Sequence, residues 1–150
     1  MKILWTDGSA NPNPGPGGYA VIEERDGEFR PVRLGREEDS SNIRMEGSAI
    51  GAAIKYAGEE GCEIHTDSEF WRKVLLEWAP KWAENGWKKK NGQIKNLTLV
   101  KAVYAYYLKY QPKLIWTKGH AGTVGNEMAD EFANKARKGL TITEWEKENQ

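Results

Sequence analysis

A two-residue turn near the N-terminus places the strongest constraint on the fold of this chain. Asp26 and Gly27 separate two strand-like runs, residues 19–25 and 28–34. An Asp-Gly pair is typical of a type I′ turn, in which both central residues have positive φ, so it predicts a tight β-hairpin. A third strand-like run, residues 2–7, precedes the hairpin. Three strands joined this closely are expected to be antiparallel neighbours.

Between the first strand and the hairpin, residues 8–18 are dense in glycine and proline. Proline has no backbone N–H and glycine weakens a strand interior, so we predict an irregular loop here. The stretch is not a phosphate-binding P-loop, because no Lys-Ser or Lys-Thr pair follows its glycines.

Helical and strand-like patterns alternate in the rest of the chain. Apolar residues recur with helical spacing over residues 43–57 and 100–108, and a short strand is predicted at 62–66. The remaining predicted elements are a helix after Asp67 that Pro80 breaks, a strand at 113–118, a loop at 119–125 and a last helix that ends near Gly139. We therefore predict an α/β fold with one five-stranded mixed sheet, three antiparallel strands followed by parallel crossovers, and helices on both faces.

Composition limits the class of protein. With 150 residues and 39% hydrophobic content, we expect one domain over residues 1–138 and a C-terminal tail over 139–150. Lys plus Arg (22) equals Asp plus Glu (22), so affinity for nucleic acid must come from local clustering of charge. The single cysteine, Cys62, lies in a short apolar run and indicates a buried thiol in a reducing compartment. No segment approaches about 20 apolar residues, so we expect a cytoplasmic protein without membrane contact. We also expect a monomer.

Four acidic residues occupy positions where a metal-dependent site can form. Asp7 ends the first predicted strand, Asp67 ends the fourth, Glu46 lies in the first turn of a predicted helix, and Asp130 lies early in the last helix. Each acid alone has an ordinary structural explanation, at a helix start or in a turn. Gathered together they would repel one another unless cations compensated their charge, and oxygen ligands suit magnesium or manganese better than zinc. Two such ions can promote phosphodiester hydrolysis.

Several blocks of this sequence closely resemble type 1 ribonuclease H. They are Thr6-Asp7-Gly8-Ser9, the stretch 13–19, Asn42-Ile43-Arg44-Met45-Glu46, Thr66-Asp67-Ser68, the stretch 118–122 and Asn126-Glu127-Met128-Ala129-Asp130. They occur in the family's order over roughly residues 2–137. The resemblance implies a ribonuclease H-like fold and an endonuclease that cleaves the RNA strand of RNA·DNA hybrids, leaving 3′-hydroxyl and 5′-phosphate ends, in the removal of replication primers and R-loops.

The same resemblance assigns roles to individual residues. It places two magnesium ions, for which manganese can substitute, on Asp7, Glu46, Asp67 and Asp130. It also implies that His120 acts near the attacking water or in product release, for which the neutral pKa range of histidine is suited. His120 in a mobile surface loop is the alternative.

Contacts to the RNA strand are implied for Gly8, Asn13 and Asn42, where backbone and amide groups would read the 2′-hydroxyl. The glycines of residues 8–18 are expected to let the backbone approach the hybrid closely. Two positions depart from the family pattern: Ile43 stands where some members carry a second amide, and Glu69 where a glutamine is often found.

A basic, aromatic segment between residues 78 and 101 resembles the family's protrusion that binds the DNA strand. Aromatic faces beside sugars and lysines against phosphates form a recurring nucleic-acid surface. Alternatively, some of these tryptophans are core residues and the lysines belong to a solvated loop. The residues expected to contact the DNA strand are Ser41, Phe70, Trp78, Trp82, Lys88, Lys89 and Asn96.

Other functions remain open at this point. Resolvases, integrases and some exonucleases resemble this metal-centred fold, but they are not expected to carry the glycine-proline block 13–18 and the block 119–122 together. A non-catalytic module could bind hybrids through residues 88–101 without a competent metal site. A detached reverse-transcriptase domain is also conceivable, but Met1 directly precedes the first predicted strand, so we expect an independent protein.

Overall fold

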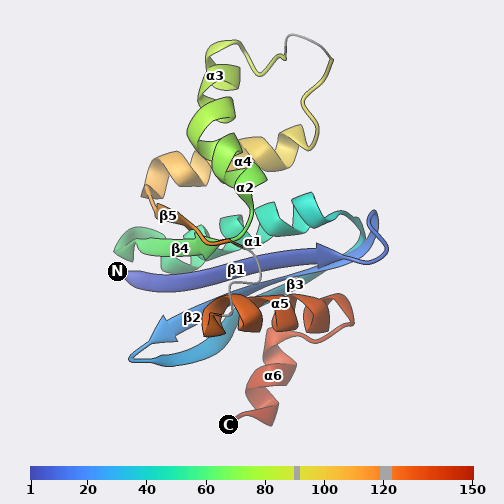
Figure 1. The fold of residues 1–150 in the computed structure, drawn as a ribbon, viewed down its shortest axis with the longest axis vertical. Helices are drawn as coiled ribbons and strands as arrows, with labels where there is room; N and C mark the ends of the chain where they lie inside the picture. The colour runs from blue at the N-terminus through green and yellow to red at the C-terminus, as the bar shows by residue number, and fades with distance from the viewer. Residues whose placement is uncertain (90–91, 119–122) are drawn as a thin grey trace.

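A computed structural model of the chain describes residues 1–89, 92–118 and 123–150. At its centre lies one five-stranded mixed sheet with the strand order β3-β2-β1-β4-β5 (Figure 1). The antiparallel neighbours are β1 (Lys2–Ala10), β2 (Gly15–Arg25) and β3 (Glu28–Ser40). On the other side of β1 the sheet continues in parallel with β4 (Cys62–Thr66) and β5 (Lys113–Trp116). The predicted fold class and sheet are confirmed.

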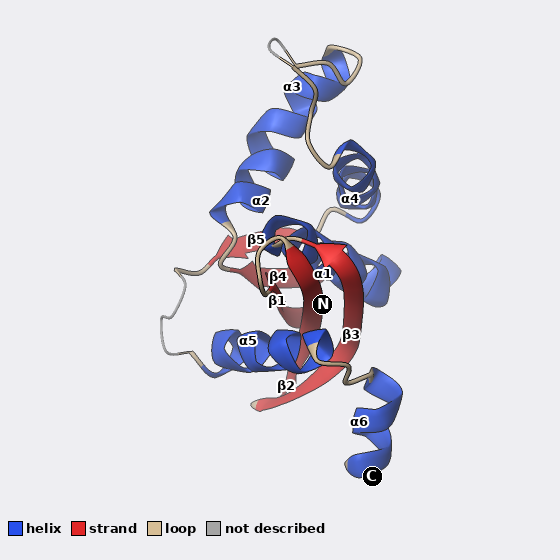
Figure 2. Ribbon diagram, turned by 90° about the vertical axis from the view of Figure 1, so that its right-hand side faces the viewer, coloured by secondary structure: helices blue, strands red, loops and turns tan. Residues whose placement is uncertain are grey.

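Helices cover both faces of this sheet, as predicted (Figure 2). On one face α1 (Asn42–Ala57) packs against β1, and α4 (Leu97–Tyr110) packs against α1. On the other face α5 (Val124–Arg137) packs across β1, β2 and β3. Each face therefore encloses its own core, built around Leu4, Ile50, Ile64 and Val103 under α1 and around Ala20, Ile22 and Phe132 under α5.

The predicted hairpin turn is present. Asp26 and Gly27 have φ values of 53° and 79°, and Arg25 pairs with Glu28 across the turn. Both central residues thus have the positive φ that a type I′ turn requires. The hairpin strands are longer than predicted, because β2 begins at Gly15 and β3 continues to Ser40.

The prediction that residues 8–18 form an irregular loop was wrong for most of this stretch. β1 continues to Ala10, and Gly8 pairs with Tyr19 in the antiparallel ladder. Two glycines of this stretch are needed for close packing. A Cβ on Gly8 would lie 2.2 Å from the carbonyl carbon of Met45 in α1, and a Cβ on Gly18 would lie 2.2 Å from the backbone nitrogen of Arg137 in α5. Helices on both faces approach the sheet too closely there for any side chain.

The predicted helix break at Pro80 does not occur. α2 (Glu69–Lys73), a π-helical turn η2 (Val74–Trp78) and α3 (Ala79–Glu84) follow one another as one rod (Figure 1). The π turn inserts an extra residue into the helix and shifts its hydrogen-bond register. Pro80 consequently falls in the first turn of α3, where the missing N–H is tolerated.

The remaining differences lie at the ends of elements. The last strand ends at Trp116 and not at Lys118, and α5 already begins at Val124, inside the predicted loop 119–125. A one-turn helix η1 (Gly58–Glu60) follows α1. Within residues 139–150, α6 (Ile142–Glu148) is helical, and its Trp145 packs edge-on against Phe132. Over residues 1–89, 92–118 and 123–150, we find no helix with the length and apolarity needed to span a membrane.

Candidate active site

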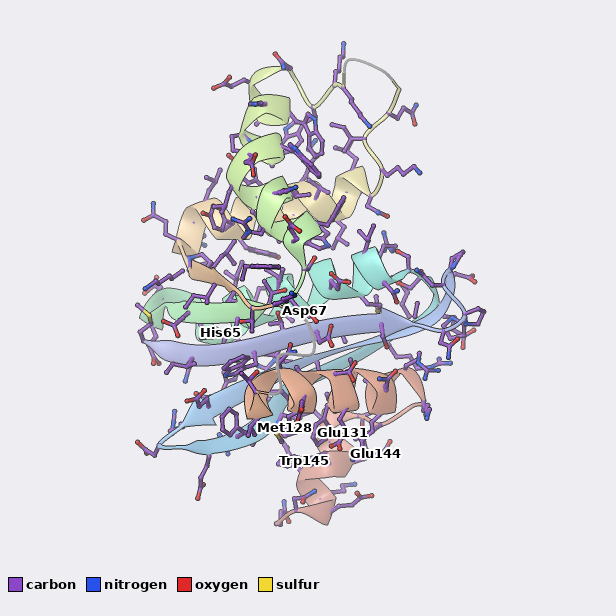
Figure 3. The ribbon with its side chains drawn as sticks, in the orientation of Figure 1. His65, Asp67, Met128, Glu131, Glu144 and Trp145 are labelled. Carbon is purple, nitrogen blue, oxygen red and sulfur yellow. The ribbon has the colours of Figure 1, made fainter. Side chains whose placement is uncertain are left out.

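Three of the four predicted metal ligands line one small pocket. Asp7, Asp67 and Asp130 surround a volume of about 120 Å³ together with Asn126 and Glu127. The register of the strands explains why Asp7 and Asp67 lie in the same pocket. Trp5 pairs with His65 across the parallel strands β1 and β4, so Asp7 and Asp67, each two residues further along, reach the same level of the sheet. Figure 3 shows Asp67 where the chain leaves β4 for α2.

Asp7 lies within β1 and not at its end, and it pairs with Ala20 of β2. Only 9% of its surface is exposed. Burial, followed by the charge of Asp67, raises the pKa of Asp7 to about 8. A 2.8 Å hydrogen bond from the backbone N–H of Gly8 lowers this pKa and so opposes the shift. Asp130 and Glu46 add smaller electrostatic contributions that raise the pKa further. This pocket therefore concentrates negative potential on a group that water cannot easily solvate.

Glu46 reaches the same group of acids from α1. It lies just past the first turn of the helix, which Ser41 caps by accepting a hydrogen bond from the Arg44 backbone N–H. Burial raises the pKa of Glu46 to about 7, and Asp67 raises it too, whereas a hydrogen bond with Ser68 opposes the shift. Although Glu46 does not line the 120 Å³ pocket, its charge is thus coupled to Asp67.

The donor set fits a hard divalent cation. Among the described residues, no three Asp, Glu, His or Cys side chains already enclose a point where a metal ion could sit. The four acids nevertheless supply carboxylate oxygens, the ligands that magnesium and manganese prefer. Burial and the neighbouring acids raise the pKa values of Asp7 and Glu46, and a cation bound beside them would favour their charged forms.

Asn126 is a site residue that the sequence analysis missed. It is 6% exposed and lines the pocket from α5 (Val124–Arg137), one helical turn before Asp130. The i, i+4 spacing of Asn126 and Asp130 was the available signal, since such residues share a helix face. Ser68 was also missed; its hydroxyl accepts a 3.1 Å bond from the Trp71 backbone N–H and so caps α2. A serine between a strand and a helix is a recognisable cap signal.

The residues predicted to contact RNA gather where β1, the following turn and α1 meet. The Asn13 side-chain oxygen accepts a 3.1 Å hydrogen bond from the Asn42 backbone N–H, and the Asn42 side-chain oxygen accepts a 2.7 Å bond from the Ala10 backbone N–H. These bonds hold both amides in place beside α1. Gly8 is buried against α1. His120, predicted to assist catalysis, lies outside the described residues.

The residues predicted to contact DNA mostly share a second feature, an apolar groove of about 440 Å³. Its lining includes Phe70, Trp78, Trp82, Lys89 and Asn96. The rings of Phe70 and Trp78 meet edge to face at 5.6 Å between centroids, and Trp82 follows at 6.1 Å from Trp78. The three rings are half-buried: they pack against the core and keep part of their surface exposed.

Two further predicted DNA contacts, Lys88 and Ser41, do not line this groove. Lys88 is exposed next to Lys89. Ser41 lies at the start of α1 and is connected to the groove residue Asn96 through Arg44, whose backbone N–H donates to Ser41 and whose guanidinium donates to Asn96.

Comparison with known proteins gives a consistent family signal. The family model described as RNase H matches residues 1–138. A protein of Bordetella pertussis named Ribonuclease H is 37% identical over 135 residues, which cover 88% of this chain and 86% of the relative. Among solved structures, LC9-RNase H1, described as a type 1 RNase H with the type 2 active-site motif, superposes with a TM-score of 0.77 at 25% identity over 94% of this chain and 74% of its own.

A foamy viral protease-reverse transcriptase, solved in complex with an RNA/DNA hybrid, also contains this fold. It superposes with a TM-score of 0.76 at 22% identity over 93% of this chain and 20% of the viral chain. At that identity the likeness concerns the fold alone.

Proposed function

This chain belongs to the RNase H family, and from that membership we propose that it is a metal-dependent endonuclease that hydrolyses the RNA strand of RNA·DNA hybrids. The observation that carries the proposal is the pocket of Asp7, Asp67 and Asp130, electrostatically coupled to Glu46. Burial and repulsion between these acids raise the pKa values of Asp7 and Glu46. Such an arrangement costs stability and calls for a cation.

In this proposal Asp7, Glu46, Asp67 and Asp130 hold two magnesium ions, for which manganese can substitute. When bound, the ions supply Lewis-acid activation of water and stabilise charge on the leaving oxygen. The carboxylates fix the site between β1, β4, α1 and α5. Asn126, buried in the same pocket as Asp130, would offer an amide to the substrate. Cleavage that leaves 3′-hydroxyl and 5′-phosphate ends follows from the same family expectation.

Two surfaces support a hybrid as the substrate. The aromatic groove with Lys89 provides stacking faces and positive charge for one backbone. The amides of Asn13 and Asn42 lie at the end of β1 and would provide donors for a 2′-hydroxyl. A foamy viral protein that contains the same fold has been solved in complex with an RNA/DNA hybrid. His120 is proposed to assist proton transfer or product release. A cytoplasmic monomer that removes primers and R-loops would fit this activity.

Labelled RNA·DNA, RNA·RNA and DNA·DNA duplexes test the proposal directly. With magnesium, the wild type should cut only the RNA of the hybrid, and chelation should stop the reaction. Asp67→Asn should abolish cleavage while the thermal unfolding curve stays cooperative. Glu131→Gln is the matched control, because Glu131 is an exposed acid on α5 that pairs with Lys135 at 3.5 Å. Hybrid binding without magnesium-stimulated cutting would instead support the non-catalytic binding module.

A further inference from the structure

A bulge in β3 brings two arginines to the same face of the sheet. Opposite the neighbouring residues 21 and 22 of β2, β3 carries residues 31 to 33, so Val32 is an extra residue in the ladder. On a regular strand, residues that are three apart project to opposite faces. The extra residue reverses this alternation, and Arg30 and Arg33 therefore project to the same face.

The ladder partners of the two arginines identify this face as the one that α1 covers. Arg33 pairs with Val21, which is buried in the core under α1. Arg30 pairs with Glu23, whose carboxylate accepts a 2.6 Å hydrogen bond from the Tyr56 hydroxyl of α1. Since paired residues of an antiparallel ladder project to the same side, both arginines lie beside the C-terminal end of α1.

Arg33 has a defined orientation. Its guanidinium carbon lies 4.8 Å from the ring centroid of Tyr56, which is a cation–π contact, and its Nη1 donates a 2.7 Å hydrogen bond to the carbonyl of Val32. Within the described part of the chain, its Nε and Nη2 donate no hydrogen bond. Arg33 can therefore offer these donors to a ligand and keep both of its existing contacts.

The buried acid of this region is already paired with other cations. Glu23 has only 3% of its side chain exposed, and its Oε2 lies 3.3 Å from Lys2 Nζ and 3.5 Å from Arg25 Nη2. Over residues 1–89, 92–118 and 123–150, neither Arg30 nor Arg33 forms an ion pair. Both arginines are also exposed, so their charges remain available to an anion.

The two arginines line a pocket of about 600 Å³ at the outer edge of β3. Tyr56 of α1 forms one wall, and α6, which packs next to β3, forms the other (Figure 2). Glu146 on α6 is the one acid among the described residues of the lining, which leaves an excess of positive charge. A pocket of this size is suited to a small molecule.

The edge of β3 favours a compact anion over an added strand. Pro31 has no backbone N–H to donate, and the bulge interrupts the ladder, so this edge is protected against pairing with an extended peptide. A terminal phosphate presents three acceptor oxygens, enough for two guanidinium groups, whereas a carboxylate presents two. The paired arginines therefore fit a phosphate better than a single carboxylate.

We propose that this pocket binds a terminal phosphate group, as in a nucleoside diphosphate or pyrophosphate, through Arg30 and Arg33. The site is separate from the four acids, because Tyr56 follows Glu46 by ten residues on α1, a distance of about 15 Å along the helix axis. The binding needs no metal ion and does not depend on the proposed hydrolysis. The 5′-phosphate at the end of a nucleic-acid strand has the same chemistry, so the experiment includes it as a separate ligand.

The test titrates the whole, isotope-labelled protein with pyrophosphate in EDTA at constant ionic strength and follows its backbone amides by NMR. Saturable shifts are expected at residues 30–33, with a Kd of about 1 mM or lower. Citrate, a carboxylate ligand of similar charge, should bind at least about fivefold more weakly. The absence of saturation at about 10 mM pyrophosphate, shifts that avoid residues 30–33, or equal binding of citrate would overturn the proposal.

Arginine variants test the two contacts separately. Arg33→Gln and Arg30→Gln should each raise the Kd for pyrophosphate about tenfold. Arg33→Lys should give an intermediate Kd, since an ammonium keeps the charge without the planar fork. Arg36→Gln is the matched control, because Arg36 lies on the same strand outside the pocket, where it donates to the Arg137 carbonyl and pairs with Glu38.

The control should change the Kd less than twofold. An equal loss of affinity in Arg36→Gln would overturn the site, because general charge would then be the cause, and so would an unchanged Kd in both pocket variants. Thermal melting identifies any folding defect, and the two independent pocket variants and Arg33→Lys keep the test decisive if one of them is unstable.

Three further ligands identify the source of the phosphate: ADP, a 5′-phosphorylated oligonucleotide and the same oligonucleotide without its phosphate. Tighter binding of ADP assigns the pocket to a free nucleotide, and tighter binding of the 5′-phosphorylated oligonucleotide assigns it to a strand end. In both cases Arg33→Gln should weaken the binding about tenfold. Equal binding of the two oligonucleotides, with neither ADP nor pyrophosphate bound, would overturn the recognition of a terminal phosphate.

Discussion

The indole N–H of Trp71 donates a 2.6 Å hydrogen bond to the backbone carbonyl of Ile43. Trp71 is fully buried in α2, four residues after Asp67, and Ile43 lies in the first turn of α1, three residues before Glu46. The bond therefore joins α1, which carries Glu46, to α2, which begins two residues after Asp67. The relative placement of Glu46 and Asp67 depends on this contact as well as on the sheet.

Trp71→Phe is expected to lower both stability and catalysis. The change removes the donor to a carbonyl and leaves a gap beside α1, so the free energy of unfolding should fall by about 1–3 kcal/mol. Because the two helices lose a common anchor, kcat should fall about tenfold with little change in KM. Urea unfolding and hybrid cleavage measure these effects. For stability, Trp87→Phe is the comparison, since Trp87 is half-buried with an edge contact to Tyr104; an equal loss in both variants would argue against a special role for Trp71.

Two glycines of α1 should respond in opposite directions to the same substitution. A Cβ on Gly47 would lie 2.1 Å from the buried ring of Trp71, whereas a Cβ on Gly51 would make an ordinary 3.4 Å contact with Val103. Gly47→Ala should destabilise the protein by about 2–3 kcal/mol through overpacking. Gly51→Ala should stabilise it by about 0.5–1 kcal/mol, because alanine favours the helix. Urea unfolding of both variants measures these changes. An increase in the free energy of unfolding for Gly47→Ala would contradict the prediction and show that the ring of Trp71 can move.

Stability in the absence of metal should fall as the pH rises through the neutral range. The folded protein binds the Asp7 proton more tightly than the unfolded chain, with a pKa of about 8 against 3.8. Its contribution to stability is complete below about pH 4 and is lost progressively as the pH approaches 8. In EDTA at pH 8, the free energy of unfolding of Asp7→Asn should thus exceed that of the wild type by about 1–3 kcal/mol. This difference should become smaller toward pH 5.

Magnesium provides the control for this experiment, because a bound cation would compensate the same charge and stabilise only the folded state. Addition of magnesium at pH 8 should raise the melting temperature of the wild type more than that of Asp7→Asn. If both proteins show the same pH dependence in EDTA, burial of Asp7 is not the cause of the loss.

The last helix should contribute to stability without contributing to cleavage. Trp145 on α6 meets Phe132 edge-on at 6.4 Å between centroids and packs against the smaller core. Trp145→Ala should lower the free energy of unfolding by about 1–3 kcal/mol. Trp145→Phe should retain most of the wild-type stability. The rate of hybrid cleavage at 25 °C should be unchanged in both. A loss of kcat with unchanged stability would place α6 in the functional machinery.

The sequence alone determined the features that depend on neighbours along the chain. Asp26-Gly27 predicted the hairpin turn through its local backbone preference, and apolar periodicity predicted the order of strands and helices. It also predicted Asp67 at the end of a strand, which Asp67 directly follows, whereas Asp7, predicted to end the first strand, lies within β1. The substrate and the role of His120 came from family resemblance and not from these physical patterns.

Tertiary structure decided the relationships between residues that are distant along the chain. Only the parallel register of β1 and β4 brings Asp7 level with Asp67, and only the packing of α5 brings Asn126 to the same pocket. The strand conformation at Gly8 was mispredicted because glycine has a low intrinsic strand preference, whereas close packing of α1 requires it there. Local propensity contributes little free energy per residue, and contacts made across the fold therefore override it.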